Sequence, residues 1–421
     1  MGLLVNKDYI IAIDFGTSKI TYALMIAEHK ADGISLSLDA IGLVKLDYKT
    51  ILHGCIENHE ELKKKTRKVF DLLLQGIEPD ITAAKHLNVS FRAEYNAEIY
   101  SITEIINGIA SKELVDSKNI GLSTLANSSE IHLNTIKNIY YSMDNQIYQK
   151  LPKGKHTTEI SFHNYNLFIK RKSWDEWLKI VTENEYFERM EHYYPSHAAA
   201  LAILSPEELE QGAFVVDFGE GCTDLTICNS NGPIFNKTVK VGFQHIVNDI
   251  SVLLDLPYNA VYDYLVNGEL NESISKEKIK ISNKVIVTKK LETIISDRIS
   301  EIAEIISEEL LNSKIPREIQ ILKLYLTGGP FEIKFIKQKF KQSLNDFPVE
   351  FRKIKQFDKL IVAEPDQEVF NDFRYVGVYG LLVNSIQEII DAGPKPTMAC
   401  KAWENLKNFF GNPNKELTDK E

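Results

Sequence analysis

Two stretches of this chain repeat one pattern, Ile10-Ile11-Ala12-Ile13-Asp14-Phe15-Gly16-Thr17-Ser18-Lys19 and Ala213-Phe214-Val215-Val216-Asp217-Phe218-Gly219-Glu220-Gly221-Cys222-Thr223-Asp224. Each is an apolar strand that ends in an aspartate, an aromatic residue and a glycine. Glycine has no Cβ, so the backbone N–H groups of such a turn can come close to phosphate oxygens. One copy alone is a weak signal, because the same pattern occurs at many ordinary turns. Two copies predict a pair of phosphate-binding hairpins that converge on one ligand.

The hairpins supply the candidate site residues. Asp14 and Asp217 end their strands, where a carboxylate can hold a divalent cation through water, so we expect them to position Mg²⁺ and an attacking water. The candidate cofactor-binding residues in the two hairpins are Gly16, Thr17, Ser18, Lys19, Gly219, Glu220, Gly221 and Thr223. A third strand, 321–327, runs into Gly328 and Gly329, which would let the backbone pass under a purine or a ribose.

The order of these three elements resembles the actin and sugar-kinase superfamily, and within it the FtsA family of bacterial cell-division proteins. The resemblance extends from residue 10 to about residue 410, and four further segments carry it: 195–204, 241–250, 291–302 and 375–382. It implies that ATP and Mg²⁺ are the cofactors. It also implies that Gly242 lies in a glycine turn at the site and that Arg298 and Glu301 face the nucleoside.

The expected fold is α/β, an actin-like (ribonuclease H-like) ATPase fold of two lobes with a small subdomain inserted in the first lobe. Apolar strand runs alternate with helical periods, which favours a mixed, largely parallel sheet in each half. The expected subdomains are 1A (1–84, 166–195 and 358–393), the insert 1C (85–165), 2A (196–236 and 305–357) and 2B (237–304). A linker (394–396) and an amphipathic tail (397–421) would follow.

Three residues depart from the family pattern. Glu220 stands where the family has glycine, and a carboxylate beside a polyphosphate costs affinity unless it points outward or meets the metal. Cys222 replaces a threonine, and Pro330 removes one possible N–H donor from the glycine turn. We therefore expect nucleotide binding with at most weak ATPase activity, in a protein that acts mainly as a nucleotide-dependent scaffold.

Size and composition bound these expectations. A chain of 421 residues can form two α/β lobes, and 44% hydrophobic with 26% charged residues is an ordinary soluble composition. Its net charge of −10 argues against nucleic acid as a partner, because a basic face supplies most of that affinity. Four cysteines without metal-ligand spacing fit a reducing compartment, and we see no apolar run of bilayer-spanning length. A cytoplasmic protein is expected.

The end of the chain predicts a membrane-binding helix. Gly393-Pro394-Lys395-Pro396 has the composition of a linker, Thr397 can cap a helix, and Gly411 can end it. Large apolar residues then share one face, with lysines at its rim: Met398, Trp403, Leu406, Phe409 and Phe410. Such a helix suits a membrane interface, although a terminal helix packed on the protein's own core is the alternative. One helix would bind weakly, and a filament of many would bind by avidity.

The resemblance implies a function in cell division. The protein would polymerise through subdomain 1C and tether FtsZ filaments to the inner face of the cytoplasmic membrane at the division site. The C-terminal tail of FtsZ would bind subdomain 2B. Six lysines there could attract an acidic tail, or they could simply form a solvated charged face: Lys276, Lys278, Lys280, Lys284, Lys289 and Lys290. The alternatives are a PilM-like scaffold that binds a membrane protein's peptide and a small-molecule kinase of the same superfamily.

Overall fold

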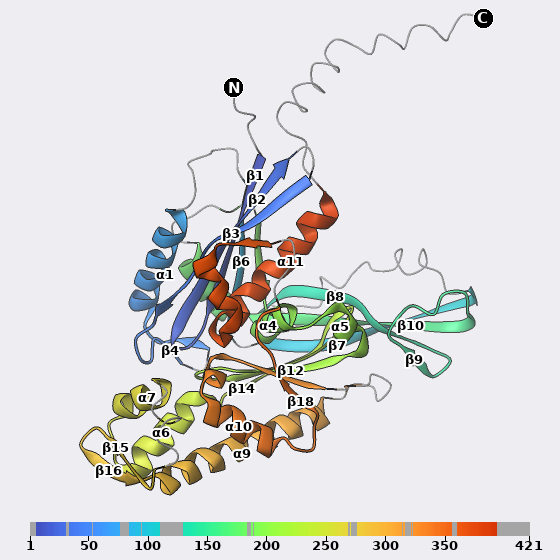
Figure 1. Ribbon diagram of the computed structural model, residues 1–421. Coiled ribbons are helices and arrows are strands. Elements are labelled where there is room, and N and C mark those ends of the chain that lie inside the picture. Colours follow the sequence, from blue (N-terminus) through green and yellow to red (C-terminus); the bar gives the residue numbers. More distant parts are fainter. Residues whose placement is uncertain are drawn as a thin grey trace, which may run out of the picture.

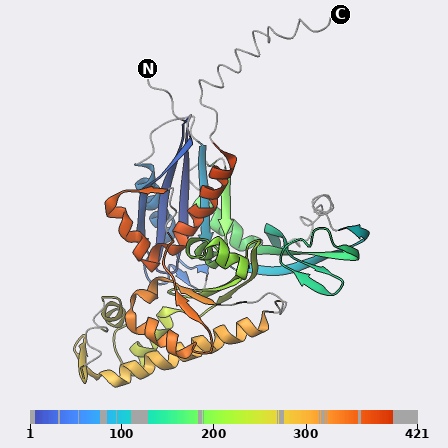
Figure 2. The same ribbon diagram turned by 45° about the vertical axis from the view of Figure 1, so that its right-hand side comes forward.

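The computed structural model forms two α/β lobes, and a separate sheet projects from the side of the molecule (Figure 1, Figure 2). It describes residues 6–30, 33–52, 54–75, 84–93, 95–109, 129–182, 187, 189–267, 270, 276–313, 315, 321, 323–355 and 360–393. The predicted linker 394–396 and the predicted membrane helix, with Met398, Trp403, Leu406, Phe409 and Phe410, lie outside the described residues.

The first lobe is built on a sheet of six strands in the order β11-β6-β1-β2-β3-β19. Their bounds are β1 (Asn6–Phe15), β2 (Lys19–Lys30), β3 (Gly33–Lys45), β6 (Ala84–Phe91), β11 (Arg189–Tyr193) and β19 (Leu360–Val362). Alternate residues of β1 enter two different cores. Ile11 and Ile13 pack with α1 (His59–Leu74) and α3 (Arg171–Val181), whereas Ile10 and Ala12 pack with α4 (Pro195–Ile203) and α11 (Val376–Ala392). A strand buried on both faces explains the uninterrupted apolar run before Asp14.

The second lobe repeats this plan with a sheet in the order β14-β13-β12-β17-β18. The strands are β12 (Ala213–Phe218), β13 (Thr223–Asn229), β14 (Gly232–Val239), β17 (Leu324–Thr327) and β18 (Val349–Phe351). In both lobes three strands form an antiparallel meander, and a parallel strand lies beside the first of them: β6 beside β1, and β17 beside β12. The repeated hairpin therefore occupies the same topological place in both lobes, between the first and second strands of the meander.

Helices and a small hairpin complete the second lobe (Figure 1). They are α6 (Phe243–Leu254), α7 (Tyr258–Val266), α9 (Thr288–Asn312), α10 (Lys334–Ser343), β15 (Lys278–Ile281) and β16 (Lys284–Val287). The helices α6, α9 and α10 account for part of the helical periodicity in the second half of the sequence. After β17, a 3₁₀ turn over Gly329–Glu332 leads to α10.

The projecting sheet is the inserted element. It consists of β7 (Tyr95–Ile109), β8 (Glu130–Met143), β9 (Gln146–Tyr148) and β10 (His156–Lys170) in the order β7-β10-β8-β9, all antiparallel. The insert was expected at 85–165, but β6 pairs in parallel with β1 and belongs to the first sheet. The separate sheet therefore begins at β7 and extends to Lys170. A parallel partner distant in sequence leaves no local signal, so β6 could not be assigned from the sequence.

Helices α4 and α11 cross at very close range between the two sheets. A Cβ on Gly380 of α11 would lie 1.7 Å from the carbonyl oxygen of Ala198 in α4. Alanines of α4 and apolar residues of α11 share one core with residues from both sheets, including Ile10 and Val215. The first and second lobes are thus packed against each other through these two helices.

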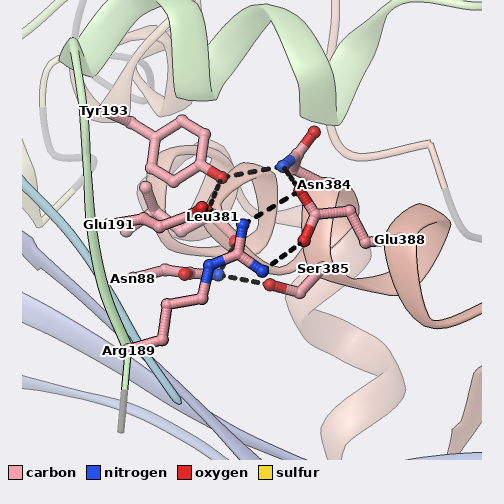
Figure 3. A network of polar contacts seen from close by, with 8 residues as sticks. All are labelled: Asn88, Arg189, Glu191, Tyr193, Leu381, Asn384, Ser385 and Glu388. Carbon is pink, nitrogen blue, oxygen red and sulfur yellow. Dashed lines mark hydrogen bonds and ion pairs between the residues drawn. The ribbon is translucent and has the colours of Figure 1, made fainter. Parts of the chain in front are cut away.

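A polar network fixes α11 to the edge of the first sheet (Figure 3). Asn88 of β6 donates to the Leu381 carbonyl (2.6 Å) and to the Ser385 hydroxyl (2.7 Å). On β11, Arg189 pairs with Glu388 at 2.9 Å. Glu191, Tyr193 and Asn384 complete the network. The buried amide of Asn88 is thereby satisfied, as a polar group inside a core must be.

The α4–α11 crossing yields a stability prediction. Gly380→Ala introduces a methyl group where the Ala198 carbonyl leaves no room, so we expect the free energy of unfolding to fall by about 2–3 kcal/mol. Gln387→Ala on the exposed face of α11 is the control and should change it by less than about 0.5 kcal/mol. Denaturant unfolding of both variants measures this, and equal stabilities would contradict the crossing.

Candidate functional site

The two hairpins have the same geometry. In each, the first glycine donates its N–H to a carbonyl three residues on, from Gly16 to Lys19 and from Gly219 to Cys222, both at 2.9 Å. The strands pair in matching register, Phe15 with Ile20 and Phe218 with Thr223. The equivalent positions are Asp14 and Asp217, Gly16 and Gly219, Thr17 and Glu220, Ser18 and Gly221, Lys19 and Cys222, and Thr21 and Asp224.

The tips of the two hairpins touch each other across the lobes. A Cβ on Gly221 would lie 2.7 Å from Oγ1 of Thr17 and 2.9 Å from its Cγ2. The Lys19 ammonium lies among Glu220, Asp14 and Asp217. Burial is the largest influence on the pKa of Lys19 and lowers it, while these three carboxylates act in the opposite direction. The two loops therefore converge on one small volume, as a shared ligand requires.

Asp14 is oriented by its neighbours in the first lobe. Its Oδ1 accepts a 2.5 Å hydrogen bond from the Ser90 hydroxyl of β6, and Thr21 donates to Oδ2 at 3.5 Å. A Cβ on Gly377, at the start of α11, would lie 2.8 Å from Oδ2. Glycine at this position leaves the carboxylate facing the junction of the lobes.

Asp217 shares a buried cation with Asp224. The guanidinium of Arg92, a first-lobe residue that follows β6, donates from Nε to Asp224 Oδ2 at 2.6 Å, and its Nη2 lies 3.7 Å from Asp217 Oδ2. Burial raises the pKa of Asp217 to about 7, against the attraction of Arg92. Burial also disfavours the charge on Arg92, but Asp224 and Asp217 outweigh it and the pKa of the guanidinium is raised.

Glu220 points into the same region. Burial raises the pKa of its carboxyl to about 7, and Lys19 of the first hairpin opposes that shift. The charge of Glu220 also acts on Tyr258 and Tyr262 of α7, whose pKa values burial raises. The Glu220 carboxyl therefore acts electrostatically on both the first hairpin and α7.

Three further glycines lie against the second hairpin or Lys19. A Cβ on Gly242 would meet the Cys222 nitrogen and the Glu220 carbonyl at 2.7 Å. One on Gly328, whose φ is +121°, would lie 2.1 Å from the Phe218 carbonyl oxygen. Beside it, a Cβ on Gly329 would lie 3.3 Å from Nζ of Lys19. These predicted residues are thus brought together with the hairpins.

Other predicted site residues are engaged elsewhere. Arg298 binds Asp249 of α6 (2.6 Å) and Glu301 (2.6 Å), which holds α9 against α6. Among the contacts of the described residues, none joins Arg298 or Glu301 to either hairpin, so their contact with a nucleoside stays a prediction. The Thr223 hydroxyl donates to the Val241 carbonyl at 2.7 Å and supports the glycine turn.

Sequence reasoning missed Arg92, Ser90 and Asp224. Ser90 and Arg92 lie in no recognisable motif, and they approach the hairpins only because β6, which contains Ser90 and precedes Arg92, pairs with β1. Asp224 lies within the second hairpin, where it pairs opposite Asp217 and binds Arg92. Two carboxylates across one strand pair could have pointed to a cation nearby, because like charges in that position repel.

The donor set fits a nucleoside phosphate in part. Two cations, bare glycines at both turns and carboxylates at two strand ends suit a phosphate chain with its metal. The hydroxyl of Thr327, in register with Asp217, is buried and has no partner among the described residues. The Thr17 side chain fills the space beside Gly221, and the Glu220 carboxyl interacts with the Lys19 ammonium across the two turns. A phosphate chain would therefore have to part the two tips.

Magnesium would depend on Asp14 and Asp217 with water and phosphate. Within the described part of the chain, no group of three or more His, Cys, Asp or Glu is arranged as metal ligands. Mg²⁺ commonly uses one or two carboxylates, waters and substrate phosphates, so two aspartates suffice for it.

The raised pKa of Glu220 yields a pH prediction. Between the ordinary carboxyl range and about pH 7 the folded chain binds more protons at Glu220 than the unfolded chain, so this group makes stability fall as pH rises. Glu220→Gln cannot ionise, and its Tm should therefore fall less than that of the unaltered protein between about pH 5 and about pH 8. Glu304→Gln, on an exposed position of α9, is the control and should retain the original pH slope. Parallel slopes for all three proteins would contradict a buried Glu220 carboxyl.

Known proteins resemble this chain in sequence and in structure. No model of a protein family matches it. Cell division protein FtsA of Helicobacter pylori is 22% identical over 380 residues, which is 82% of this chain and 75% of the relative. Cell division protein FtsA of Neisseria meningitidis serogroup B is 28% identical over 162 residues, which is 36% of this chain and 39% of the relative.

Two solved structures have the same fold. The PilM-PilN type IV pilus biogenesis complex matches with a TM-score of 0.56 at 11% identity, over 90% of this chain and 98% of the other. MreB 5 of Spiroplasma citri bound to AMPPNP matches with a TM-score of 0.50 at 13% identity, over 91% and 98%. The chain therefore has the actin-like α/β fold and is similar, over most of its length, to the cell-division protein FtsA.

Proposed function

We propose that this chain is an ATP-binding, actin-like protein of bacterial cell division. The observation that carries the proposal is the contact between two equivalent aspartate-tipped hairpins from opposite lobes. Similarity to FtsA over most of the chain supports the cellular role, and the MreB 5 structure of the same fold was solved with AMPPNP. The ligand is therefore a nucleoside triphosphate held between the lobes.

Different residues of the proposed site would hold the metal, the phosphates and the nucleoside. Bound Mg²⁺ would screen the phosphate charges, and Asp14 and Asp217 would hold it through water. Lys19 and the backbone of both turns would bind the phosphates, with Thr17, Ser18 and Thr223 supporting the turns. Gly242, Gly328, Gly329, Arg298 and Glu301 would frame the nucleoside. Glu220 adds a negative charge where phosphates would lie, so any ATPase activity is weak and the protein acts mainly as a scaffold.

Subdomain 2B offers a surface for the FtsZ tail. Val252 and Leu253 at the end of α6 and Val285 and Val287 in β16 are exposed. Lys284 joins the two elements, because its Nζ binds the Leu254 carbonyl at 2.9 Å and Asp255 at 3.0 Å. Exposed apolar residues beside lysines suit an acidic peptide that carries apolar side chains.

Filament formation and membrane attachment complete the proposal. The inserted sheet β7–β10 would contact a neighbouring subunit, and residues 397–421 would lie in the membrane interface. Among the described helices, none has both the length and the apolar character needed to cross a bilayer. Many tails on one filament would bind lipid together, so assembly would strengthen attachment.

A PilM-like scaffold is the second candidate. The match to the PilM-PilN complex favours it, because its TM-score exceeds that of MreB 5. Such a scaffold would bind a membrane protein's cytoplasmic peptide instead of lipid. A small-molecule kinase of the same superfamily would instead transfer phosphate to an added substrate.

Nucleotide binding is tested with a lysine variant and a matched control. Lys19→Ala removes the ammonium that lies among the three carboxylates, and we expect the affinity for AMPPNP to fall about tenfold or more, since bonds to charged groups are strong. Lys45→Ala is the control. Lys45 lies opposite Lys19 in the pairing of β2 with β3, but its side chain is exposed. Calorimetric titration measures both. Unchanged affinity in Lys19→Ala would remove the region between the two hairpins as the nucleotide site.

Partner binding is tested by pelleting and flotation. Lys278→Glu with Lys280→Glu should weaken pelleting with an FtsZ C-terminal peptide at least about fivefold, because the charge that attracts an acidic tail is reversed. Lys341→Glu, exposed on α10, should leave pelleting unchanged.

In flotation with anionic liposomes, deletion of residues 394–421 should abolish lipid binding. Lipid binding that survives the deletion would remove the tethering role of the tail, and an absence of lipid binding in the full chain would favour the PilM-like scaffold.

A further inference from the structure

Arg92 links three parts of the molecule. It follows β6 of the first lobe, precedes β7 of the inserted sheet, and extends its guanidinium to the second hairpin. A Cβ on Gly219 would lie 3.2 Å from Nη2 of Arg92, so the guanidinium rests directly on the bare turn where phosphate would bind. This side chain belongs to one lobe and contacts the phosphate loop of the other.

The main chain on both sides of Arg92 is held in place. Gly54, with φ of +85°, lies in the turn between β4 (Ile51–Leu52) and β5 (Cys55–Ile56), and a Cβ there would be 3.2 Å from the Arg92 carbonyl carbon. Phe91 stacks on Trp177 of α3 at 4.6 Å, and the Tyr95 hydroxyl donates to the Phe91 carbonyl at 2.5 Å. A change of partners at the site would therefore move the guanidinium rather than the strand.

The two carboxylates near Arg92 are held with unequal strength. Asp224 accepts the short bond from Nε (2.6 Å) and another from the Thr238 hydroxyl (2.6 Å). Asp217 lies 3.7 Å from Nη2, which is beyond hydrogen-bond distance. The Nη side of the guanidinium can thus turn to a phosphate while Nε stays on Asp224, and the planar fork of arginine suits phosphate oxygens.

A chain of partly buried polar contacts leads from Arg92 to the root of the insert. Asp224 accepts from Thr238 of β14, and Thr238 bonds the Tyr194 hydroxyl at 2.6 Å. The Tyr194 ring meets Tyr95 of β7 edge-on at 5.1 Å. Thr238 of β14 thus connects Asp224, in the second hairpin, with Tyr194, which contacts the insert.

A second contact joins the same strand to the insert. The Tyr165 hydroxyl of β10 donates to Asn236 of β14 at 2.6 Å, and Asn236 donates to Thr226 of β13 at 2.6 Å. Strand β10 through Tyr165, and strand β7 through the contact of Tyr95 with Tyr194, are therefore both linked to the sheet that carries Asp217 and Asp224. A shift of this sheet's hairpin would be felt by β10 as well as by β7.

We propose that Arg92 binds the terminal phosphate of the nucleoside triphosphate and couples its presence to the orientation of the inserted sheet. The inference rests on the proposed nucleotide site and assigns it a ligand-sensing residue. A diphosphate lacks the group that would draw Nη away from Asp217, so Arg92 then keeps its present partners. The insert, the proposed filament contact, would thereby distinguish triphosphate from diphosphate.

The test compares nucleotide preference with hydrogen exchange in the full chain. AMPPNP and ADP are each used to displace a fluorescent nucleotide from the protein, which gives their relative affinities. Amide hydrogen exchange of β7 and β10 is followed with each nucleotide bound. Arg92→Gln should lower the preference for AMPPNP over ADP about tenfold or more, because a charged hydrogen bond is lost. It should also abolish the change in amide exchange of the insert that AMPPNP produces and ADP does not. Arg189→Gln, an arginine of β11 remote from the hairpins, is the control and should keep both responses.

A second variant decides the question if Arg92→Gln leaves Asp217 and Asp224 unpaired and fails to fold. Arg92→Lys keeps a positive charge, but one compact ammonium cannot bond Asp224 and a phosphate together. It should retain the AMPPNP preference and lose the exchange response. An unchanged preference in Arg92→Gln, or an intact exchange response in Arg92→Lys, would overturn the proposal. If the unaltered protein binds neither nucleotide, the nucleotide site itself is disproved.

Discussion

The organisation of this molecule depends on the contact between two hairpin tips that carry opposite charges. Lys19 on the first tip faces Glu220 and Asp217 on the second, and Arg92 crosses from the first lobe to Asp224. Each cation lies among carboxylates in a poorly solvated space, where electrostatic interactions are strong and the ionised state of each group depends on its neighbours. Any anion that enters must therefore compete with Glu220 and Asp217 for the same two cations.

The fold supplies the rigidity that this balance needs. Strands β1 and β12 are buried on both faces, and their alternate residues enter cores shared with α4 and α11. Since Gly380 lets these helices cross at backbone distance, the two sheets are held at a fixed separation. Opening of the hairpins would be a movement about this packed centre, as expected for two lobes with a continuous core.

Sequence patterns predicted the parts of the structure that are local. The hairpins, the double glycine and α9 each follow from residues adjacent in the chain, and a fold resemblance added their order. The position of β6 was not predictable, because its pairing with β1 is parallel and distant. For the same reason Arg92 and Ser90 were missed. Arg298 contacts Asp249, and its place beside a nucleoside stays a prediction. Side chains that reach the site from another strand are visible only once the sheet is assembled.

A crystal structure of the full chain with AMPPNP and Mg²⁺ tests the central claim most directly. The account predicts one triphosphate bound between the hairpins, with backbone N–H groups from the tips of both turns on its oxygens and Asp14 and Asp217 facing a single metal. The Thr17–Gly221 contact would be replaced by phosphate. A nucleotide bound elsewhere, or hairpins still touching in a crystal that holds the ligand, would contradict it.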